Sequence, residues 1–206
     1  KMYNNKFGDA ANVGGRGSVK ALRIESLTFN QILNFNKELG LHNVSAMVGH
    51  ESYRYVEKSV FAQRTGFPLE MSNDLVFGAQ LEDGSSQTDE HAIEGWFGQV
   101  GYDYANRYYI SGSYRRDGSS RFYKDSRWGD FWSVGASWRI SQEAFMKNAK
   151  WMDNLKLKVS YGVQGNDNIL DENENPYYYA WQNFFEPYPN HDFGGVIHST
   201  TGNRDL

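Results

Sequence analysis

The strongest constraint on the fold of this 206-residue chain is a strict alternation of apolar and polar side chains between residues 92 and 163. In one uninterrupted span, Trp132, Val134 and Ala136 alternate with Ser133 and its small or polar neighbours. This period of two residues is typical of a β-strand whose two faces meet different surroundings. A helix would need a period of about 3.6 residues, which none of these runs has. The chain is therefore predicted to be all-β.

The alternation predicts six strands. They are Leu22 to Asn36, Asn43 to Val56, Glu90 to Tyr104, Arg107 to Arg116, Phe131 to Ile140 and Leu155 to Gln164. Two weaker strand candidates are Leu75 to Leu81 and Tyr177 to Asn183. A short helix is predicted from Ser141 to Met146 because Ser141 is a favourable N-cap residue, and Arg54 to Gln63 is a second helix candidate. Asp117 and Gly118 predict a turn.

Two kinds of protein satisfy this alternation. In a soluble sandwich the apolar face meets a core, whereas in a membrane barrel it meets lipid. The predicted connections alternate in length: they are short at residues 37–42 and 105–106, medium at 141–153, and long at 57–89, 117–127 and 165–206. An antiparallel up-and-down transmembrane barrel, with tight turns on one side and large loops on the other, produces this alternation. A Greek-key sandwich has no reason to keep it.

Composition narrows the function classes. Aromatic residues make up 16% of the chain and crowd toward strand ends, as in the girdles of membrane barrels, although other β-rich proteins also use them heavily. The sequence has no apolar run near the length of a transmembrane helix. A net charge of −4 argues against a nucleic-acid surface, and the absence of cysteine excludes a disulfide framework or a thiol nucleophile.

Six strands are too few for a closed barrel of this kind. An open sheet edge in lipid would leave backbone groups unpaired, at several kcal/mol for each group. The chain is therefore predicted to be part of a larger barrel. Lys1 is not followed by the pattern of a secretory signal, so a signal is expected to lie upstream or to have been removed.

Residues 90–168 carry a dense set of family motifs. They include Tyr-Arg-Arg-Asp-Gly-Ser-Ser-Arg-Phe at 114–122, Arg-Trp-Gly at 127–129, Ser-Val-Gly-Ala-Ser-Trp-Arg-Ile at 133–140 and Gly-Val-Gln-Gly-Asn at 162–166. In this order the motifs closely resemble the barrel of SusC/RagA-type TonB-dependent transporters. The resemblance weakens outside this block, and the loop from Ile169 to Ser199 shows no family pattern.

The resemblance implies a plugged barrel of about 22 strands, of which residues 1–206 are a barrel-domain fragment that contains no plug. It further implies active uptake of oligosaccharides or peptides across the outer membrane of a Gram-negative bacterium. The implied partners are a SusD-like surface lipoprotein, membrane lipid and the TonB complex, the last bound through other parts of the protein. The alternatives are a passive porin or other outer-membrane barrel, and a soluble carbohydrate-binding β-sandwich.

Enzymatic chemistry is not expected. The five histidines are scattered, with no HExxH pair, and no serine lies in a nucleophile elbow. Residues 14–18 are rich in glycine but lack the lysine of a phosphate-binding loop. No cofactor is implied. Four loop carboxylates are weak calcium candidates, although their spacing does not fit an EF-hand and acidic loops are usually only solvated. These are Asp167, Asp171, Glu172 and Glu174.

The candidate substrate-binding residues are aromatic side chains of the last predicted loop. They are Tyr177, Tyr178, Tyr179, Trp181, Phe184 and Phe185. Flat rings in an outer loop can stack on sugar rings or pack against a protein lid, since both present apolar faces with polar edges. The alternative is that these rings only join the loop to itself.

The assignment of faces generates a prediction. Val134→Arg or Val159→Arg should cost about 2–4 kcal/mol if these side chains lie near the middle of the bilayer. Ser133→Arg should cost far less because its side chain faces the barrel interior. Unfolding of the full-length barrel in lipid measures the difference, and equal losses for Val134→Arg and Ser133→Arg would contradict the assignment.

Overall fold

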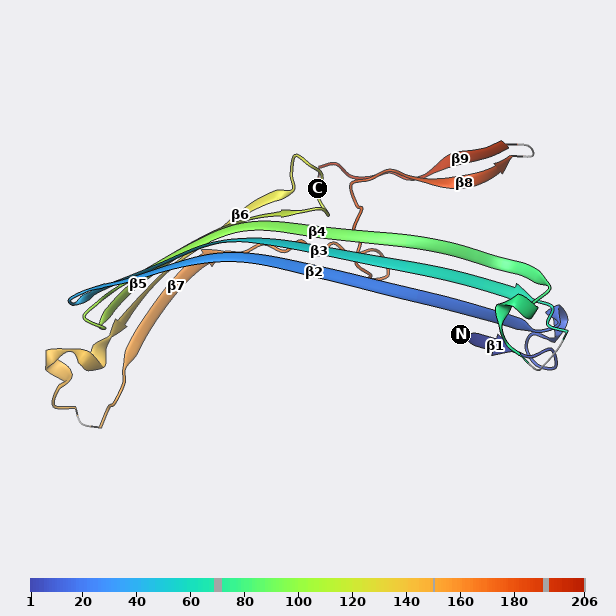
Figure 1. Ribbon diagram of the computed structural model, residues 1–206. Helices are drawn as coiled ribbons and strands as arrows, with labels where there is room; N and C mark the ends of the chain where they lie inside the picture. The colour runs from blue at the N-terminus through green and yellow to red at the C-terminus, as the bar shows by residue number, and fades with distance from the viewer. Residues whose placement is uncertain (69–71, 150, 191–192, 206) are drawn as a thin grey trace. The chain divides into compact units, whose positions relative to one another are not determined.

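The computed structural model describes residues 1–68, 72–149, 151–190 and 193–205, and this part of the chain is almost entirely β-structure. Its strands are β1 (Met2–Asn4), β2 (Arg16–Leu39), β3 (His42–Thr65), β4 (Gln80–Tyr104), β5 (Tyr108–Ser119), β6 (Trp128–Arg139), β7 (Lys156–Val163), β8 (Phe184–Asn190) and β9 (Phe193–Thr200) (Figure 1). Four single 3-10 turns are η1 (Ala11–Val13), η2 (Leu75–Phe77), η3 (Ile140–Gln142) and η4 (Ala144–Met146). No helix of the described residues is long and apolar enough to span a membrane.

The strands form an antiparallel meander. Strands β1 to β7 lie in one sheet in the order in which they occur in the sequence, and β8 pairs with β9 in a separate hairpin. The pairs β4–β5, β5–β6 and β6–β7 are all antiparallel. This up-and-down order confirms the predicted fold class, because a Greek key would place a later strand beside an earlier one.

The chain divides into two compact units. One comprises Lys1–Leu27 and Tyr55–Glu90, and the other comprises Thr28–Arg54 and His91–Leu206. In the first unit, the connection between β3 and β4 contains Phe67, whose side chain is 1% exposed. The Tyr3 ring contacts the Phe67 ring edge-on, with 5.2 Å between centroids. The second unit holds β5 to β9 and the chemically distinctive residues described below.

All six predicted strands are present, but the predicted long loop at residues 57–89 is wrong. Strand β3 continues to Thr65 and β4 begins at Gln80, so residues 66–79 alone connect them. The helix candidate Arg54 to Gln63 is also wrong, because these residues lie in β3. The added strand residues carry polar side chains on both faces, so they lack the apolar alternation that marks the other segments.

Further corrections concern the weaker elements. Leu75 to Leu81 begins with the turn η2, and only its last two residues belong to a strand. Tyr177 to Asn183 is not a strand, whereas β8 and β9 lie in the segment predicted as the loop 165–206. Both hairpin strands contain Pro or Gly, which lower strand propensity and obscure the pattern. The predicted loop 117–127 is shorter, because β5 continues to Ser119.

The one or two helical turns predicted from Ser141 to Met146 are present as the 3-10 turns η3 and η4, but the predicted N-cap is wrong. Ser141 makes no capping bond, and Glu143 between the two turns is extended, with φ −76° and ψ 152°. Its carboxylate accepts hydrogen bonds from the Tyr108 hydroxyl at 2.6 Å and from the Trp138 indole at 3.0 Å. These two bonds from β5 and β6 hold Glu143 out of a continuous helix.

The short turns are as predicted. Between β4 and β5, Ala105 and Asn106 have φ of 53° and 55°, and the Arg107 amide donates to the Tyr104 carbonyl at 2.9 Å. Two successive residues with positive φ define a type I′ turn, whose twist matches that of the strands it joins. Gly40, with φ of 64°, begins the two-residue link from β2 to β3.

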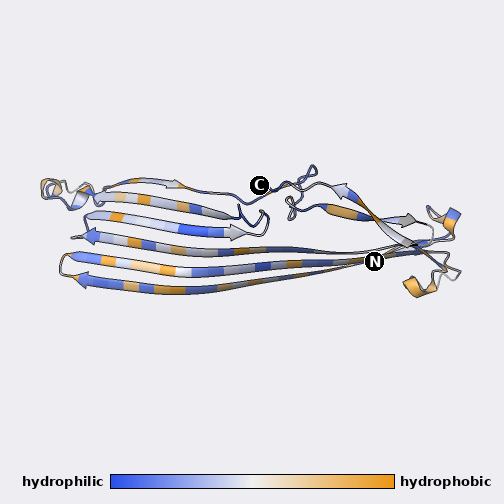
Figure 2. Cartoon of the chain, turned by 90° about the horizontal axis from the view of Figure 1, so that it is seen from above, coloured by the Kyte–Doolittle hydropathy of each residue, from blue (hydrophilic) through white to orange (hydrophobic). Residues whose placement is uncertain are grey.

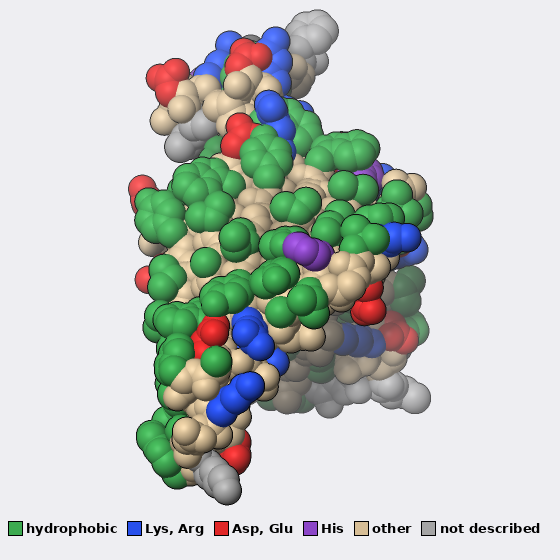
Figure 3. All heavy atoms as spheres, turned by 90° about the vertical axis from the view of Figure 1, so that its left-hand side faces the viewer, with side chains coloured by type: hydrophobic (Ala, Val, Ile, Leu, Met, Phe, Trp, Pro, Cys, Tyr) green, Lys and Arg blue, Asp and Glu red, His purple; other side chains and the backbone are tan. Residues whose placement is uncertain are grey.

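Few apolar side chains are buried. Among the described residues, the buried apolar side chains are Ala10, Val56, Phe67 and Ala180. By contrast, Val134 is 52% exposed and Val159 is 67% exposed, although both belong to the apolar side of the alternation. Apolar and polar bands alternate along the strands in Figure 2, and hydrophobic side chains gather over much of the face shown in Figure 3. A soluble sandwich would cover such a face with a second sheet.

Two strand glycines are expected to respond differently to substitution. A Cβ at Gly162 would lie 2.9 Å from the Ser133 Cβ and 3.0 Å from the Trp132 carbonyl oxygen. At Gly112 the nearest atom would be the Ser133 carbonyl oxygen, at an ordinary 3.9 Å. Gly162→Ala should therefore destabilise the full-length barrel by about 1–3 kcal/mol through overpacking. Gly112→Ala is the matched control, and equal thermal stability of both variants in detergent would contradict the close approach of β6 and β7 at Gly162.

Candidate functional site

The register of β4 to β7 assembles a continuous apolar face. Four cross-strand rows lie on it: Tyr104, Tyr108, Trp138 and Leu157; Tyr102, Ile110, Ala136 and Val159; Val100, Gly112, Val134 and Tyr161; Gly98, Tyr114, Trp132 and Val163. Each row contains one residue from each strand, and neighbouring residues in a row are directly opposite. The two outermost rows hold most of the rings, as expected of aromatic belts at the two boundaries of a lipid bilayer.

Charged residues begin directly beyond the last row. Arg116 lies opposite Trp96 on one side and opposite Asp130 on the other. Its guanidinium carbon lies 5.7 Å from the centre of the Trp128 ring, and its Nε lies 3.8 Å from the Asp130 carboxylate. The apolar face is therefore bounded by polar groups at the end nearer the long loops.

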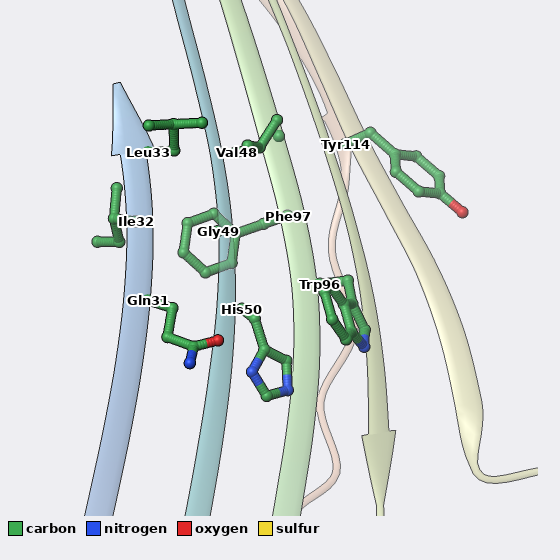
Figure 4. A pocket seen from close by; sticks show the side chains of 10 residues that line it. Gln31, Ile32, Leu33, Val48, Gly49, His50, Trp96, Phe97 and Tyr114 are labelled. Atoms are coloured by element: carbon green, nitrogen blue, oxygen red, sulfur yellow. The ribbon is translucent and has the colours of Figure 1, made fainter. Parts of the chain in front are cut away.

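A shallow depression of about 580 Å³ lies over Gly98 on this face (Figure 4). Leu33, Val48 and Trp96 are among its lining residues. The His50 ring lies beside the Trp96 ring, tilted by 34°, with 4.2 Å between centroids. The depression exists because Gly98 has no side chain in a row where Tyr114 and Trp132 do. Its lining is mostly apolar, and Gln31 and His50 are the polar exceptions.

The opposite face of the same strands is polar. The Ser113 and Ser133 hydroxyls share a hydrogen bond at 2.7 Å across β5 and β6. Nearer the short turns, the Asn43 amide donates to the Asp103 carboxylate at 3.1 Å. The two faces therefore differ as the alternation predicts, with apolar groups on one side and hydroxyl, amide and charged groups on the other.

A pocket of about 400 Å³ lies on the polar face at the end nearer the long loops. Arg115 joins two carboxylates there: it donates to Glu51 at 3.0 Å and to Asp117 at 2.6 and 2.7 Å. Its guanidinium carbon also lies 5.3 Å from the centre of the Phe97 ring. Arginine held by carboxylates beside an aromatic ring suits a ligand with both polar groups and a flat apolar face.

Glycines shape this pocket around Phe131. A Cβ at Gly129 would lie 2.7 Å from the Phe131 ring, and one at Gly165 would lie closer still, so larger residues at either position would displace the ring. The ring therefore occupies space that two glycines leave open, one on the same strand and one just after β7. This explains in packing terms why glycines of the Arg-Trp-Gly and Val-Gln-Gly-Asn motifs stand at these positions.

Next to the pocket, a buried polar cluster joins the loop after β7 to the sheet. The Ser119 hydroxyl donates to the Asp167 carboxylate at 2.8 Å, and His91 Nε2 lies 3.2 Å from the same oxygen. Arg121 donates to the Asp167 carbonyl at 3.0 Å and to the Asn168 side chain at 3.1 Å. These bonds join strands β4 and β5 to residues 167–168.

The surroundings of His91 disfavour its protonated form. His91 precedes the first β4 residue paired with β5, outside the apolar rows, and burial together with the nearby Arg121 charge lowers its pKa. Ser119 and Asp167 both meet the same ring nitrogen of His91, Nε2. In a nucleophile relay the serine and the carboxylate engage opposite ring nitrogens, so this geometry differs from that of a catalytic triad.

The structure brings most of the predicted aromatic residues together. Tyr178 lies over the Arg121 guanidinium at 4.9 Å and beside the His91 ring at 5.7 Å. The Trp181 indole donates to the Ser120 carbonyl at 3.1 Å. Tyr179 meets the rings of Tyr178 and Phe184 edge-on.

These contacts agree with the interpretation that the rings join the loop to itself and to the sheet. Tyr177 is half-buried, and its amide donates to the Ile169 carbonyl at 2.8 Å. Phe185 lies apart on β8, is 59% exposed and meets the His198 ring edge-on. Substrate contact by the six residues stays a prediction.

The calcium candidates have other contacts. Asp167 belongs to the buried cluster, and the Asp171 carboxylate accepts the Asn173 and Asn175 amides at 2.9 and 2.8 Å. These amides, the Asn175 amide above all, lower the Asp171 pKa. Glu172 and Glu174 are exposed. Within the described ranges, no three His, Cys, Asp or Glu side chains are placed to hold a metal ion.

Sequence reasoning missed the residues of the polar pocket. Asp117 and Gly118 were predicted to form a turn, whereas both lie within β5. The sequence does contain one relevant pattern. Ser113, Arg115 and Asp117 are spaced two residues apart, so in a strand their side chains point to the same face. The pairing of Arg115 with Glu51 depends on distant strands and leaves no local pattern.

No family model matches the chain. It is similar to the TonB-dependent receptor SusC of Bacteroides thetaiotaomicron, with 31% identity over 176 residues that cover 85% of this chain. It is also 32% identical over 161 residues to the TonB-dependent receptor P3 of Formosa agariphila, across 77% of this chain. The chain spans only 17% and 16% of the lengths of these two relatives.

The same similarity holds in three dimensions. A solved structure of the RagAB peptide transporter matches with a TM-score of 0.83 and 29% identity, over 93% of this chain and 21% of the matched chain. The RagAB peptide importer in its open-open state matches with a TM-score of 0.82. Sequence motifs, meander topology and two-faced strands agree with these matches, and the chain belongs to the SusC/RagA-type TonB-dependent receptors as a segment of their β-barrel.

Proposed function

We propose that this chain forms part of the wall of an outer-membrane, TonB-dependent importer of oligosaccharides or peptides in a Gram-negative bacterium. A SusD-like surface lipoprotein is the proposed partner on the outside, and the TonB complex supplies energy through other parts of the protein. The chain itself makes and breaks no bond in this function. Its role is to separate lipid from a polar interior.

The observation that carries this proposal is the opposite chemistry of the two sheet faces. Four rows of apolar side chains lie exposed on one face, whereas hydroxyls, amides and the Glu51–Arg115–Asp117 network lie on the other. In water, so large an exposed apolar face would be covered by a partner. In a transporter barrel, lipid covers it, and the polar face borders the transport path.

The turns give the orientation. Tight turns link β2 to β3 and β4 to β5, and such turns face the periplasm in bacterial barrels. The long connections and the polar pocket then lie toward the cell exterior, where a substrate arrives. The pocket around Arg115 is therefore the proposed point of contact between this part of the wall and the substrate.

Uptake by cells tests the proposal as a whole. The full-length protein should be expressed with its lipoprotein partner, and accumulation of fluorescent oligosaccharides and peptides should be measured with and without a functional TonB complex. Loss of accumulation without TonB, with the barrel still present in the outer membrane, is the expected result. Uptake that does not depend on TonB would favour a passive porin, and a soluble, detergent-independent protein would favour a carbohydrate-binding sandwich.

A neighbouring pair of arginines tests the role of the pocket. Arg115→Gln should weaken substrate uptake by about 10- to 100-fold, because a partly buried charged hydrogen-bonding group contributes about 1.5–3 kcal/mol. Arg116→Gln is the matched control, since adjacent strand residues point to opposite faces. The concentration giving half-maximal uptake measures the effect. If both variants gave the same half-maximal concentration with equal amounts of folded barrel, the pocket would not take part in substrate binding.

A further inference from the structure

Two cations face each other on the polar face of β6 and β7. Arg139 and Lys156 are directly opposite in the register, and both belong to the side of the strands that carries Ser133 and Ser137 rather than the apolar rows. Lys158 is two residues further along the same face, opposite Ser137. Like charges directly opposite each other destabilise a pair of strands, so this arrangement needs compensation.

A tyrosine supplies part of that compensation. The Lys156 ammonium lies 3.7 Å from the centre of the Tyr109 ring, and the Arg139 guanidinium carbon lies 5.7 Å from the same centre. The Tyr109 hydroxyl donates to the Asn106 carbonyl at 2.8 Å, which fixes the ring beside the type I′ turn. A cation over an aromatic ring is stabilised weakly, and one ring serves both cations here.

No carboxylate within the described ranges pairs with Arg139, Lys156 or Lys158. Glu143 accepts from Tyr108 and Trp138, whose side chains belong to the apolar face. Asp103, on the polar face, accepts from the Asn43 side chain and the Asn106 amide. The Arg139 Nε is buried without a hydrogen-bond partner, which is costly for a charged group. Among the described residues, the cluster therefore forms a patch of net positive charge on the polar face.

We propose that Arg139 and Lys156 bind a carboxylate on a segment of the longer protein outside these 206 residues. This inference rests on the proposed function, because it takes the polar face to be the barrel interior. A protein segment is favoured because the chain spans only 17% of its relative SusC, so most of the protein lies elsewhere. An Asp or Glu side chain complements both cations.

The position of the pair fits this occupant. Arg139 is the last residue of β6 and Lys156 is the first of β7, next to the turns η3 and η4. By the orientation proposed above, this end of the interior is periplasmic, away from the pocket around Arg115 where substrate enters. The site therefore joins the wall to the protein's own interior segment at the far end of the path.

Carbodiimide cross-linking of the purified full-length protein tests the inference. The reagent couples a lysine amine to a carboxylate in contact with it, forming an amide with net loss of water, and peptide mass spectrometry identifies the pair. We expect Lys156 to couple to an Asp or Glu of the same protein outside residues 1–206. The ion pair of Lys1 with Asp74 is the internal positive control.

Substitutions give a second readout with a definite sign. Both substitutions are compared in a Tyr109→Leu background, which removes the contact between the Lys156 ammonium and the Tyr109 ring and leaves only the charge interactions of Lys156. In this background, if a carboxylate is bound, Lys156→Gln lowers the thermal transition of the full-length protein relative to Lys156→Arg, which keeps the charge but cannot be cross-linked. If the cations stand alone, Lys156→Gln relieves their repulsion and raises the transition, and the proposal fails. Coupling of Lys156 only to residues within this chain, or to a separate protein, would equally overturn it.

The result is independent of the uptake experiment. A cross-link to the same protein combined with TonB-independent uptake would keep the interior contact and reject active import. Active import without the cross-link, with a raised thermal transition for Lys156→Gln, would keep the function and reject the site. A bound small anion would give the lowered transition without a cross-link, and that too would reject a protein segment as the occupant.

Discussion

The cross-strand register of β4 to β7 is the constraint on which the rest of the structure depends. Because side chains alternate in a strand, a slip of one residue would move every apolar group to the polar face. Val100, Gly112, Val134 and Tyr161 form one row only in the observed register, and the same holds for the rows on either side. Fixing the register thus assembles both the lipid-facing surface and the polar pocket at once.

The register is fixed at the strand ends. At one end, the type I′ turn at Ala105 and Asn106 and the bonds to Glu143 from Tyr108 and Trp138 hold β4, β5 and β6 in step. At the other end, the buried cluster of His91, Ser119 and Asp167 joins the loop after β7 to β4 and β5. Most side chains between these ends lie at the surface. The hydrogen bonds at the strand ends therefore stabilise the register, as a packed core would in a globular protein.

The two faces of the sheet differ in where their charged side chains lie. On the apolar face, Arg116 and Asp130 appear only beyond the last row. On the polar face, charges occur along the strands: Arg115 is compensated by Glu51 and Asp117, whereas Arg139 and Lys156 are not compensated within the described residues. An excess of positive charge therefore remains on this part of the polar face.

The all-β class, the six central strands, the two faces and the family resemblance of the motifs at residues 114–122 and 162–166 could all be predicted from the sequence. These features are local, because a period of two and a turn residue are visible within a few positions. The remaining features depend on partners that are distant in the sequence and became visible only in the fold. Strands β2, β3 and β4 extend through polar segments because neighbouring strands satisfy their backbone groups, and Glu143 leaves the helical conformation because Tyr108 and Trp138 bind it. The hydrogen bond between Arg115 and Glu51 and the placement of Arg139 opposite Lys156 both depend on strand pairing, which no local sequence pattern reveals.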